Sequence, residues 1–339
     1  MNSTAELASW LDHHREVVRR ISRDPRDIER KLALAGRNLD RAARVLAAGD
    51  PDFALVAAES AMVNAADAVL SRQNVRVEKE LAASLARRLG LAFDEGVVLG
   101  EGTNVLVHLR PVPVVARVTR LAHLVRPPES LAGGVALARA LGERAVPPSA
   151  LIEPGPHLEA GRYITFWTYR TGRPASASEA GAALRALHKN AEPYHGVLRS
   201  FDPRPEALRV ADLVGGEAGE ILRDAAGRLT PPALPQQAIH GDAHFENVLA
   251  GGVWQDFDEA CFGPREWDVA CMIHRWAVFG ELEREMQTAL AAYGACDLEA
   301  VEALQPLVVL GIAAWGSLAP LIGESSPRTA HRLEWLRRH

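Results

Sequence analysis

AIHGDAHFENVLAGGVWQDFDEACFGPREWDVA, residues 238–270, carries the strongest signal in this chain. A short apolar entry leads to His240-Gly241-Asp242, and Asn247 follows Asp242 by five positions. An apolar segment with a Gly251-Gly252 turn then leads to Asp256-Phe257-Asp258. Short apolar runs separated by glycine turns favour strands and hairpins. The segment is therefore predicted to present Asp242, Asn247 and Asp256 on loops next to short strands.

This order of residues suits phosphoryl transfer. That reaction uses an Asp that accepts the proton of the attacking hydroxyl, an Asn that holds Mg²⁺, and a second Asp that holds the metal on the nucleotide phosphates. Protein kinases use H-R-D-x-x-x-x-N followed by D-F-G. In this chain Gly241 replaces the Arg, and Asp258 replaces the final Gly. A metallophosphoesterase cluster is the alternative for HGDAH, but its later Gly-Asn-His is missing.

The same segment resembles the aminoglycoside phosphotransferase and choline kinase family. The catalytic loop of that family reads H-G-D-x-H-x-x-N, which matches residues 240–247, and its G-P-x-x-x-D-L-A segment is similar to residues 263–270. The resemblance implies a two-lobed α+β kinase-like fold with a small antiparallel sheet lobe and a larger helical lobe. It also implies ATP and Mg²⁺ as cofactors, Asp242 and His240 as catalytic residues, and Asn247 and Asp256 as metal ligands.

Length and composition limit the remaining possibilities. With 339 residues the chain is expected to form two or three structural units. A net charge of -5 gives no basic surface for nucleic acid. Three cysteines without metal-binding spacing favour the reduced cytoplasm. No signal peptide is evident, and the apolar stretch 307–322 contains Pro320 and two glycines, so we expect a core helix and no membrane contact.

The predicted domains are an all-α helical bundle at 1–77, a small lobe with its hinge at 78–170, and a large lobe with the catalytic loop at 171–339. Apolar residues recur at helical spacing in the bundle region, on both sides of a Gly49-Asp50-Pro51 break. This region is similar to HEPN-type helical domains. After Arg72 it lacks the His of the ribonucleases among them, so we expect a structural bundle that supports a homodimer.

Three β-branched runs, at 97–99, 104–109 and 114–118, predict antiparallel strands after a helix at 78–90. The turn between the first two strands contains four candidate residues for phosphate contacts through backbone N–H groups, namely Gly100, Gly102, Thr103 and Asn104. Arg117 lies where a kinase has its third-strand Lys, and the family often reads V-A-R-V there. Because guanidinium groups bind phosphate well, Arg117 is predicted to contact the nucleotide.

The next helix, at 131–141, lacks the Glu that pairs with this basic residue in kinases. Gly134 occupies its place, and two adjacent glycines are expected to weaken the start of the helix. Either Glu129 substitutes for the missing Glu, or the ion pair is absent. The second possibility leaves an alternative function open, a catalytically weak or inactive pseudokinase that binds a nucleotide or a partner.

The aromatic, β-prone run 163–169 is predicted to form the strand and hinge between the lobes, with Thr168 and Tyr169 at the adenine. In antibiotic kinases of the family, acidic residues on late helices select the acceptor. The candidates for that role here are Asp258, Glu259, Glu281 and Glu285. Together these features predict an ATP- and Mg²⁺-dependent kinase that phosphorylates a hydroxyl of a small molecule, at the family level an aminoglycoside or a similar cationic or polyhydroxylated compound.

Overall fold

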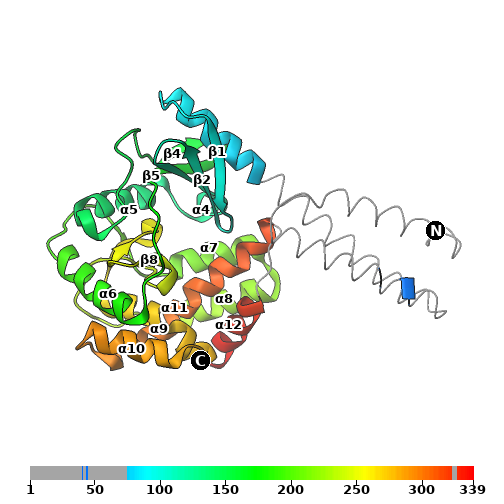
Figure 1. Ribbon diagram of the computed structural model, residues 1–339. Coiled ribbons are helices and arrows are strands. Elements are labelled where there is room, and N and C mark those ends of the chain that lie inside the picture. Colours follow the sequence, from blue (N-terminus) through cyan, green and yellow to red (C-terminus); the bar gives the residue numbers. More distant parts are fainter. Residues whose placement is uncertain (1–39, 41–42, 45–74, 323–326) are drawn as a thin grey trace, which may run out of the picture. The chain divides into compact units, whose positions relative to one another are not determined.

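The computed structural model describes Asp40, residues 43–44, 75–322 and 327–339 (Figure 1). The chain divides into two compact units, Met1–Val77 with Pro320–Glu324, and Glu78–Ala319 with Ser325–His339. The predicted helical bundle and its dimer contacts fall on 1–77, almost all of which lies outside the described residues, so both stay predictions. The second unit contains the two predicted lobes.

The small lobe is built on an antiparallel sheet of five strands in the order β1-β2-β3-β5-β4. A helix over residues 75–88 precedes it, close to its predicted place. The strands are β1 (Glu95–Gly100), β2 (Asn104–Arg110), β3 (Val114–Thr119), β4 (His157–Glu159) and β5 (Arg162–Thr168). The predictions for β1, β2 and β3 are confirmed. Every residue of β3 is buried, and β3 pairs with β2 and β5, so Arg117 is held in the middle of the sheet.

Two helices and a 3-10 turn follow β3, namely α4 (Ala122–Val125), α5 (Pro128–Leu141) and η1 (Gly142–Arg144). The predicted weak start of α5 is wrong, because α5 begins at Pro128 and both Gly133 and Gly134 lie buried within it. A Cβ on Gly134 would lie 2.1 Å from the carbonyl oxygen of Phe257. The glycine therefore allows the helix backbone to approach the segment that carries Asp256.

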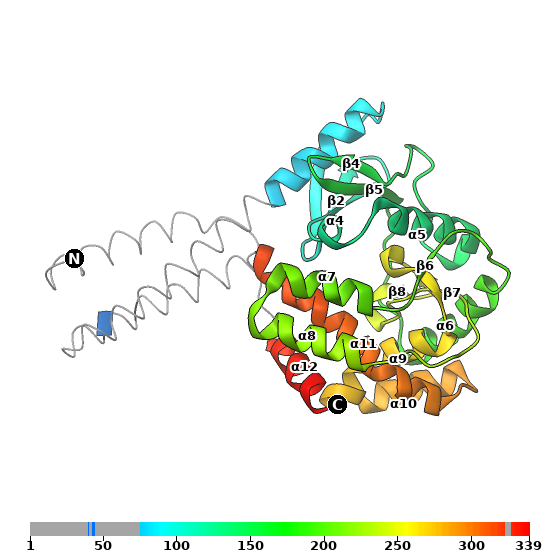
Figure 2. The ribbon, with the colours of Figure 1, turned by 180° about the vertical axis from the view of Figure 1, so that it is seen from behind.

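The large lobe is mainly helical (Figures 1 and 2). Its helices are α6 (Ala177–Ala191), α7 (Arg204–Val214), α8 (Gly216–Arg228), α9 (Arg265–Phe279), α10 (Glu283–Tyr293), α11 (Leu298–Leu318) with the 3-10 turn η4 (Ala319–Ile322), and α12 (Pro327–Arg338). A capping box of Ser176 and Glu179 begins α6. α6 packs on α10, while α11 packs on α7 and α9.

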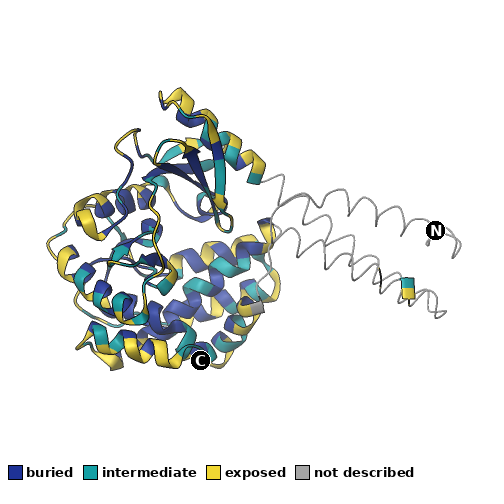
Figure 3. Cartoon of the chain, in the orientation of Figure 1, coloured by how far each residue is buried: buried dark blue, intermediate teal, exposed yellow. Residues whose placement is uncertain are grey.

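The apolar stretch near the C-terminus belongs to α11, whose side chains Leu304, Leu307 and Val308 are in the core of the large lobe. Figure 3 shows the buried residues of this helix among those of its neighbours. By length and composition alone, Leu298–Ile322 is the single helix of the described residues that could cross a membrane. The prediction of a core helix at this place is confirmed by its packing.

The segment at 238–270 forms short strands and 3-10 turns between the sheet and the large-lobe helices. In chain order they are β7 (Gln237–Ile239), η2 (Phe245–Asn247), β8 (Val248–Leu249), β9 (Val253–Trp254), η3 (Phe257–Glu259) and β10 (Cys261–Gly263). β8 pairs with β9, and β10 lies between β7 and β6 (Arg199–Ser200). The predicted loops on short strands are therefore present.

Candidate active site

Asp268, on α9, anchors the loop that carries Asp242. Its fully buried carboxylate accepts hydrogen bonds from the N–H of His240 at 2.9 Å and the N–H of Gly241 at 2.7 Å. His188 Nε2 lies 3.0 Å from the same carboxylate. Hydrogen bonds to a charged acceptor are the strong ones, so the loop backbone is tightly held. Sequence analysis did not select Asp268 as a site residue, and its only signal was the family-like segment around it.

Gly241 is required by backbone geometry. Its φ is +85°, a left-handed conformation that favours glycine. A Cβ at this position would also lie 2.0 Å from the carbonyl oxygen of Glu259. Trp267 Nε1 donates to the carbonyl of Gly241 at 2.9 Å. An Arg, as in protein kinases, does not fit here.

His240 supports the loop and does not reach the reacting groups. The residue is fully buried, and its ring packs against Trp254 and Phe257. Its Nε2 lies 2.9 Å from the carbonyl oxygen of Gln255, which fixes that nitrogen as the donor, while Nδ1 faces the N–H of Asp242 at 3.3 Å. Both ring nitrogens of His240 are thus used within the fold, and a catalytic role for this residue stays a prediction.

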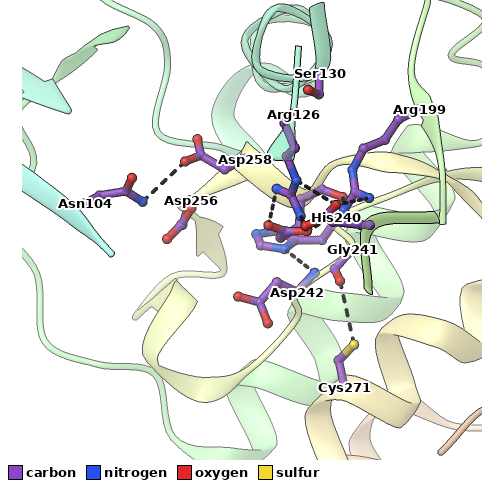
Figure 4. Close-up of polar contacts among 12 residues, drawn as sticks. Asn104, Arg126, Ser130, Arg199, His240, Gly241, Asp242, Asp256, Asp258 and Cys271 are labelled. Atoms are coloured by element: carbon purple, nitrogen blue, oxygen red, sulfur yellow. Dashed lines mark hydrogen bonds and ion pairs between the residues drawn. The ribbon is translucent and has the colours of Figure 1, made fainter. Parts of the chain in front are cut away.

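Asp242 presents its carboxylate to a cavity between the lobes, and 38 % of its side chain is exposed. His244 Nε2 lies 3.5 Å from its Oδ2. Burial raises the pKa of this carboxyl, but the hydrogen bond and charge of His244 outweigh it and lower the pKa to about 2. Asp242 is therefore ionised throughout the neutral range. Figure 4 shows it apart from the arginine pairs.

Asn247 and Asp256 offer oxygen ligands beside Asp242. Asn247 Nδ2 donates to the carbonyl oxygen of Asp242 at 2.9 Å, and its Oδ1 accepts no hydrogen bond from the described residues. Asp256 has a left-handed backbone (φ 65°) and lines the cavity. The part of the chain that is described contains no cluster of three or more His, Cys, Asp or Glu side chains fit for a metal. One carboxylate and one amide oxygen nevertheless suit Mg²⁺, which is commonly held by one or two carboxylates plus substrate phosphates.

Arg117 forms two buried ion pairs next to this oxygen pair. Its Nη2 lies 2.6 Å from Asp256 Oδ1, and its Nε donates to Asp258 Oδ2 at 2.9 Å. Burial lowers the pKa of the guanidinium, but the two carboxylates outweigh burial and raise it above its usual range. Arg117 is thus a permanent cation on the cavity wall.

The ion-pair partner of Arg117 differs from both sequence-based expectations. The expected substitute, Glu129, lies exposed in the first turn of α5, and no contact with Arg117 is found among the described residues. Nor is the ion pair absent, because Asp258 supplies the carboxylate from η3. Where the kinase motif D-F-G ends in Gly, this chain has Asp258. Where kinases have a Glu on the helix after the third strand, it has Gly134. Asp258 therefore supplies the carboxylate that the helix glutamate supplies in kinases, and Gly134 leaves room for α5 to approach the backbone of Phe257.

The glycine turn between β1 and β2 is only partly at the cavity. Thr103 and Asn104 line it, whereas Gly100 and Gly102 do not. The side-chain amide of Asn104 lies against Asp258 (Figure 4), and it also lies next to the guanidinium of Arg117. The turn thus reaches the cavity through Thr103 and Asn104 and not through its glycines, and its contact with phosphates stays a prediction.

The predicted hinge residues are engaged inside the small lobe. The N–H of Thr168 donates to the carbonyl of Pro147 at 3.0 Å, and the N–H of Tyr169 donates to the carbonyl of Pro113 at 2.8 Å. The ring of Tyr169 stacks on His108. Neither residue lines the cavity, so their backbone N–H groups are not available to an adenine in this structure.

A quartet of charged residues lines the same cavity, formed by Arg126, Arg199, Glu206 and Glu259, of which Arg126 and Glu206 are buried and the other two are partly exposed (Figure 4 labels the two arginines). Arg126 donates to both oxygens of Glu206, at 2.9 and 2.8 Å, and also bonds Glu259. Arg199 pairs with Glu259 as well. The charges of the two guanidinium groups and the two carboxylates therefore sum to zero. Glu259, a predicted acceptor ligand, is committed to this quartet, as Asp258 is to Arg117.

The cavity has a volume of about 410 Å³ and takes its walls from both lobes. Thr103, Asn104 and Arg117 line it on the small-lobe side, while α9, α10, α11 and α12 contribute on the large-lobe side. Of the predicted acceptor ligands on the late helices, neither Glu281 nor Glu285 lines it. Glu281 pairs with Arg275 and Arg328, and Glu285 is exposed on the outer side of α10.

A family model matches the part of the chain that forms this site. The model of the phosphotransferase enzyme family (APH) matches residues 100–307, which is more than half of the chain. The chain belongs to this phosphotransferase family. The predicted family resemblance is thereby confirmed. A search of curated proteins gave no match.

Solved structures with the same fold include phosphotransferases for several small molecules. The choline kinase of Streptococcus pneumoniae has a TM-score of 0.57 and 14 % identity, over 78 % of this chain and 98 % of its own. A microcompartment-associated aminopropanol kinase has a TM-score of 0.54 and 16 % identity, over 75 % and 93 %. A spectinomycin phosphotransferase in complex with ADP and spectinomycin has a TM-score of 0.50 and 10 % identity, over 77 % and 93 %. The predicted two-lobed kinase-like fold is confirmed.

Proposed function

We propose that this phosphotransferase moves the γ-phosphoryl group of ATP to a hydroxyl of a small molecule in a Mg²⁺-dependent reaction in the cytoplasm. The observation that carries the proposal is the ionised Asp242 in one cavity with Asp256 and Arg117, with Asn247 bonded to its backbone. In a loose phosphoryl-transfer transition state the protein contributes mainly positioning and charge stabilisation. These residues are of the right types for both.

Asp242 accepts a hydrogen bond from the acceptor hydroxyl and directs its oxygen at the γ-phosphorus. As the new O–P bond forms, the bond from the γ-phosphorus to the bridging oxygen of ADP breaks, and the hydroxyl proton passes to the carboxylate. With a pKa of about 2, Asp242 is a weak base, so it takes the proton late, when the hydroxyl has become acidic through its bond to phosphorus. Positioning is therefore its main contribution.

Asn247 Oδ1 and the Asp256 carboxylate are proposed to hold Mg²⁺. When bound, the ion neutralises charge on the nucleotide phosphates. Arg117 pairs with Asp256 in this structure, and its Nη groups are proposed to turn to the phosphates when the nucleotide binds. Asp258 holds the Nε side of the guanidinium and keeps it oriented. Thr103 and Asn104 are proposed to contact the phosphates from the small-lobe side.

The alternative of an inactive pseudokinase rests on Gly134. The ion pair between Arg117 and Asp258 weakens that argument, because the basic residue keeps a buried carboxylate partner. The family-level expectation of an aminoglycoside or similar cationic acceptor has less support. The two similar kinases are named for choline and aminopropanol, which both carry a cationic nitrogen, whereas α9 and α12 contribute Arg275, Arg328 and Arg332 to this cavity.

Asp242→Asn tests the proposal. The amide is close in shape to the carboxylate but cannot take the proton, so we expect kcat for ATP turnover with hydroxyl compounds to fall by about 10²- to 10⁴-fold. ATP binding with Mg²⁺, measured by calorimetry, is expected to stay within about threefold of the parent. Asp224→Asn, an exposed carboxylate on α8, is the control and should change neither quantity.

Equal turnover in Asp242→Asn and the parent would remove Asp242 from its role. No binding of ATP to the parent at millimolar concentration, with or without Mg²⁺, would overturn the proposal. The pseudokinase hypothesis predicts binding of nucleotide without turnover in any panel of hydroxyl compounds.

A further inference from the structure

Helices α9 and α12 contribute three guanidinium groups and no carboxylate to the described lining of the cavity. Arg275 from α9 and Arg328 and Arg332 from α12 line it. We call these three residues the arginine wall. Within the described ranges, Glu281 is the carboxylate that pairs with it, at 2.7 Å from Arg275 and 3.0 Å from Arg328. Glu281 thus forms ion pairs with two of the three guanidinium groups. The third, that of Arg332, has no ion pair with a described carboxylate.

Arg332 is the unpaired member. The residue is 9 % exposed, and its Nε donates to His274 Nε2 at 3.0 Å. Its two terminal nitrogens have no hydrogen-bond partner among the described residues. Burial and the positive charges of Arg328 and Arg275 lower its pKa to about 10, so the group is still a cation at neutral pH. A buried charge without a counter-ion is costly, which makes such a group a candidate for ligand binding.

No described carboxylate lies within ion-pair distance of Arg332, although Glu281 is near enough to raise its pKa slightly. Burial, together with the charge of Arg332, lowers the pKa of His274 to about 4, so this ring is neutral at pH 7. Glu206 and Glu259 are committed to Arg126 and Arg199. Asp256 and Asp258 are committed to Arg117. Among the described residues no carboxylate is left to pair with Arg332, so its counter-ion is expected from a ligand.

Apart from Arg275 and His274, the lining that comes from α9, α10 and α11 is apolar. It includes Met272, Met286, Ile312 and the ring of Trp315, which packs under Arg126 at 4.5 Å. Pockets for small molecules typically combine such apolar walls with a few polar groups that fix orientation. Here those polar groups are Arg332 and Asp242.

We propose that the acceptor carries an anionic group, a carboxylate or a phosphate, that binds Arg332 while its hydroxyl reaches Asp242. A planar guanidinium donates two parallel hydrogen bonds to either group, and both are stronger than bonds between neutral groups. The apolar walls then contact a short apolar body between the anion and the hydroxyl. The hydroxyl end of this inference rests on the proposed function, whereas the anion end rests on Arg332 alone.

The test uses the full chain and three probes that share one benzyl alcohol body. They are 4-(hydroxymethyl)benzoate, 4-(hydroxymethyl)phenyl phosphate and 4-(aminomethyl)benzyl alcohol, which carry a carboxylate, a phosphate and an ammonium group. Calorimetry at pH 7.5 gives the three affinities. We expect at least one anionic probe to bind about tenfold or more tightly than the ammonium probe. The difference between the first two probes tells a carboxylate from a phosphate.

Arg332→Met keeps most of the side-chain volume and removes the charge. We expect it to abolish the preference for the anionic probes, lowering their affinity about tenfold and leaving the ammonium probe no weaker. Arg338→Met on the same helix is the matched control, because Arg338 is 66 % exposed and paired with Glu334. It should retain the preference of the parent.

Three results would overturn the inference. They are tighter binding of the ammonium probe by the parent, an unchanged preference in Arg332→Met, and no binding of either anionic probe at about 10 mM, a concentration that detects millimolar affinity. ATP binding with Mg²⁺ is measured on the same samples. Loss of nucleotide binding with a retained anion preference contradicts only the proposed function, whereas the reverse pattern contradicts only the anionic acceptor.

Discussion

Arg126 and Arg332 both line the cavity and are 7 % and 9 % exposed, yet their surroundings are opposite in charge. Arg126 donates to the carboxylates of Glu206 and Glu259 and is part of a balanced quartet. Arg332 donates to a neutral His274 and has two arginines for neighbours. The same residue type therefore stabilises the fold on one side of the cavity and is left for a ligand on the other.

The largest effect is expected where the charges balance. Arg126→Met removes the main counter-ion of the buried Glu206 and one of the two partners of Glu259, while Arg199 still pairs with both, so the free energy of unfolding should fall by about 2–4 kcal/mol. Urea denaturation measures this change. Arg139→Met, on the exposed side of α5, is the control and should stay within about 0.5 kcal/mol of the parent. A loss below about 1 kcal/mol in Arg126→Met would mean that water already solvates the quartet.

A much smaller effect, with the opposite tendency, is expected at the other arginine. Arg332→Met removes a buried charge that lacks a carboxylate, and loses one hydrogen bond and a cation–π contact with Phe279. These terms oppose each other, so the free energy of unfolding without ligand should stay within about 1 kcal/mol of the parent or rise. The same urea series provides the measurement. A loss as large as that of Arg126→Met would erase the distinction between the two arginines.

The smallest effect concerns the pH dependence of Asp242, whose low pKa depends on His244. In His244→Gln the burial of Asp242 persists while the hydrogen bond and positive charge disappear, so the pKa of Asp242 should rise from about 2. Because the ionised form is the active one, activity is lost as pH falls through this pKa. The acid limb of the pH–rate profile should therefore move to higher pH, with little change near pH 8.

His195→Gln, at an exposed site, serves as the control for this profile. An unmoved acid limb in His244→Gln would show that Asp242 is kept ionised by other charges. A limb that moves to lower pH would contradict the assigned interaction altogether.

The catalytic segment was predictable because its contacts are local. Gly241, Asp242 and Asn247 form one turn, and the bond from Asn247 to the carbonyl of Asp242 spans five residues. The strands of the small lobe were predictable for the same reason, since β-branched runs and glycine turns define them along the chain. The helix of the large lobe at 298–318 followed from its apolar composition.

The features that sequence reasoning missed are contacts between distant parts of the chain. His240 was selected as catalytic, but Trp254, Phe257 and Gln255 enclose it. The N–H groups of Thr168 and Tyr169 were assigned to the adenine, but prolines in two separate loops accept their hydrogen bonds. Periodicity and motif spacing describe a residue's neighbours along the chain and do not identify its partners in space.

By itself, the sequence determined the order of the catalytic groups, since the turns that carry Asp242, Asn247 and Asp256 are encoded within one short segment. Only the tertiary structure decided that Asp258 is the partner of Arg117, 141 residues away in the chain, because this depends on the close approach of α5 at Gly134. It alone decided, too, that no described carboxylate pairs with Arg332. The physical reason is that a buried charge takes its function from the counter-ions that folding brings to it, and those come from remote elements.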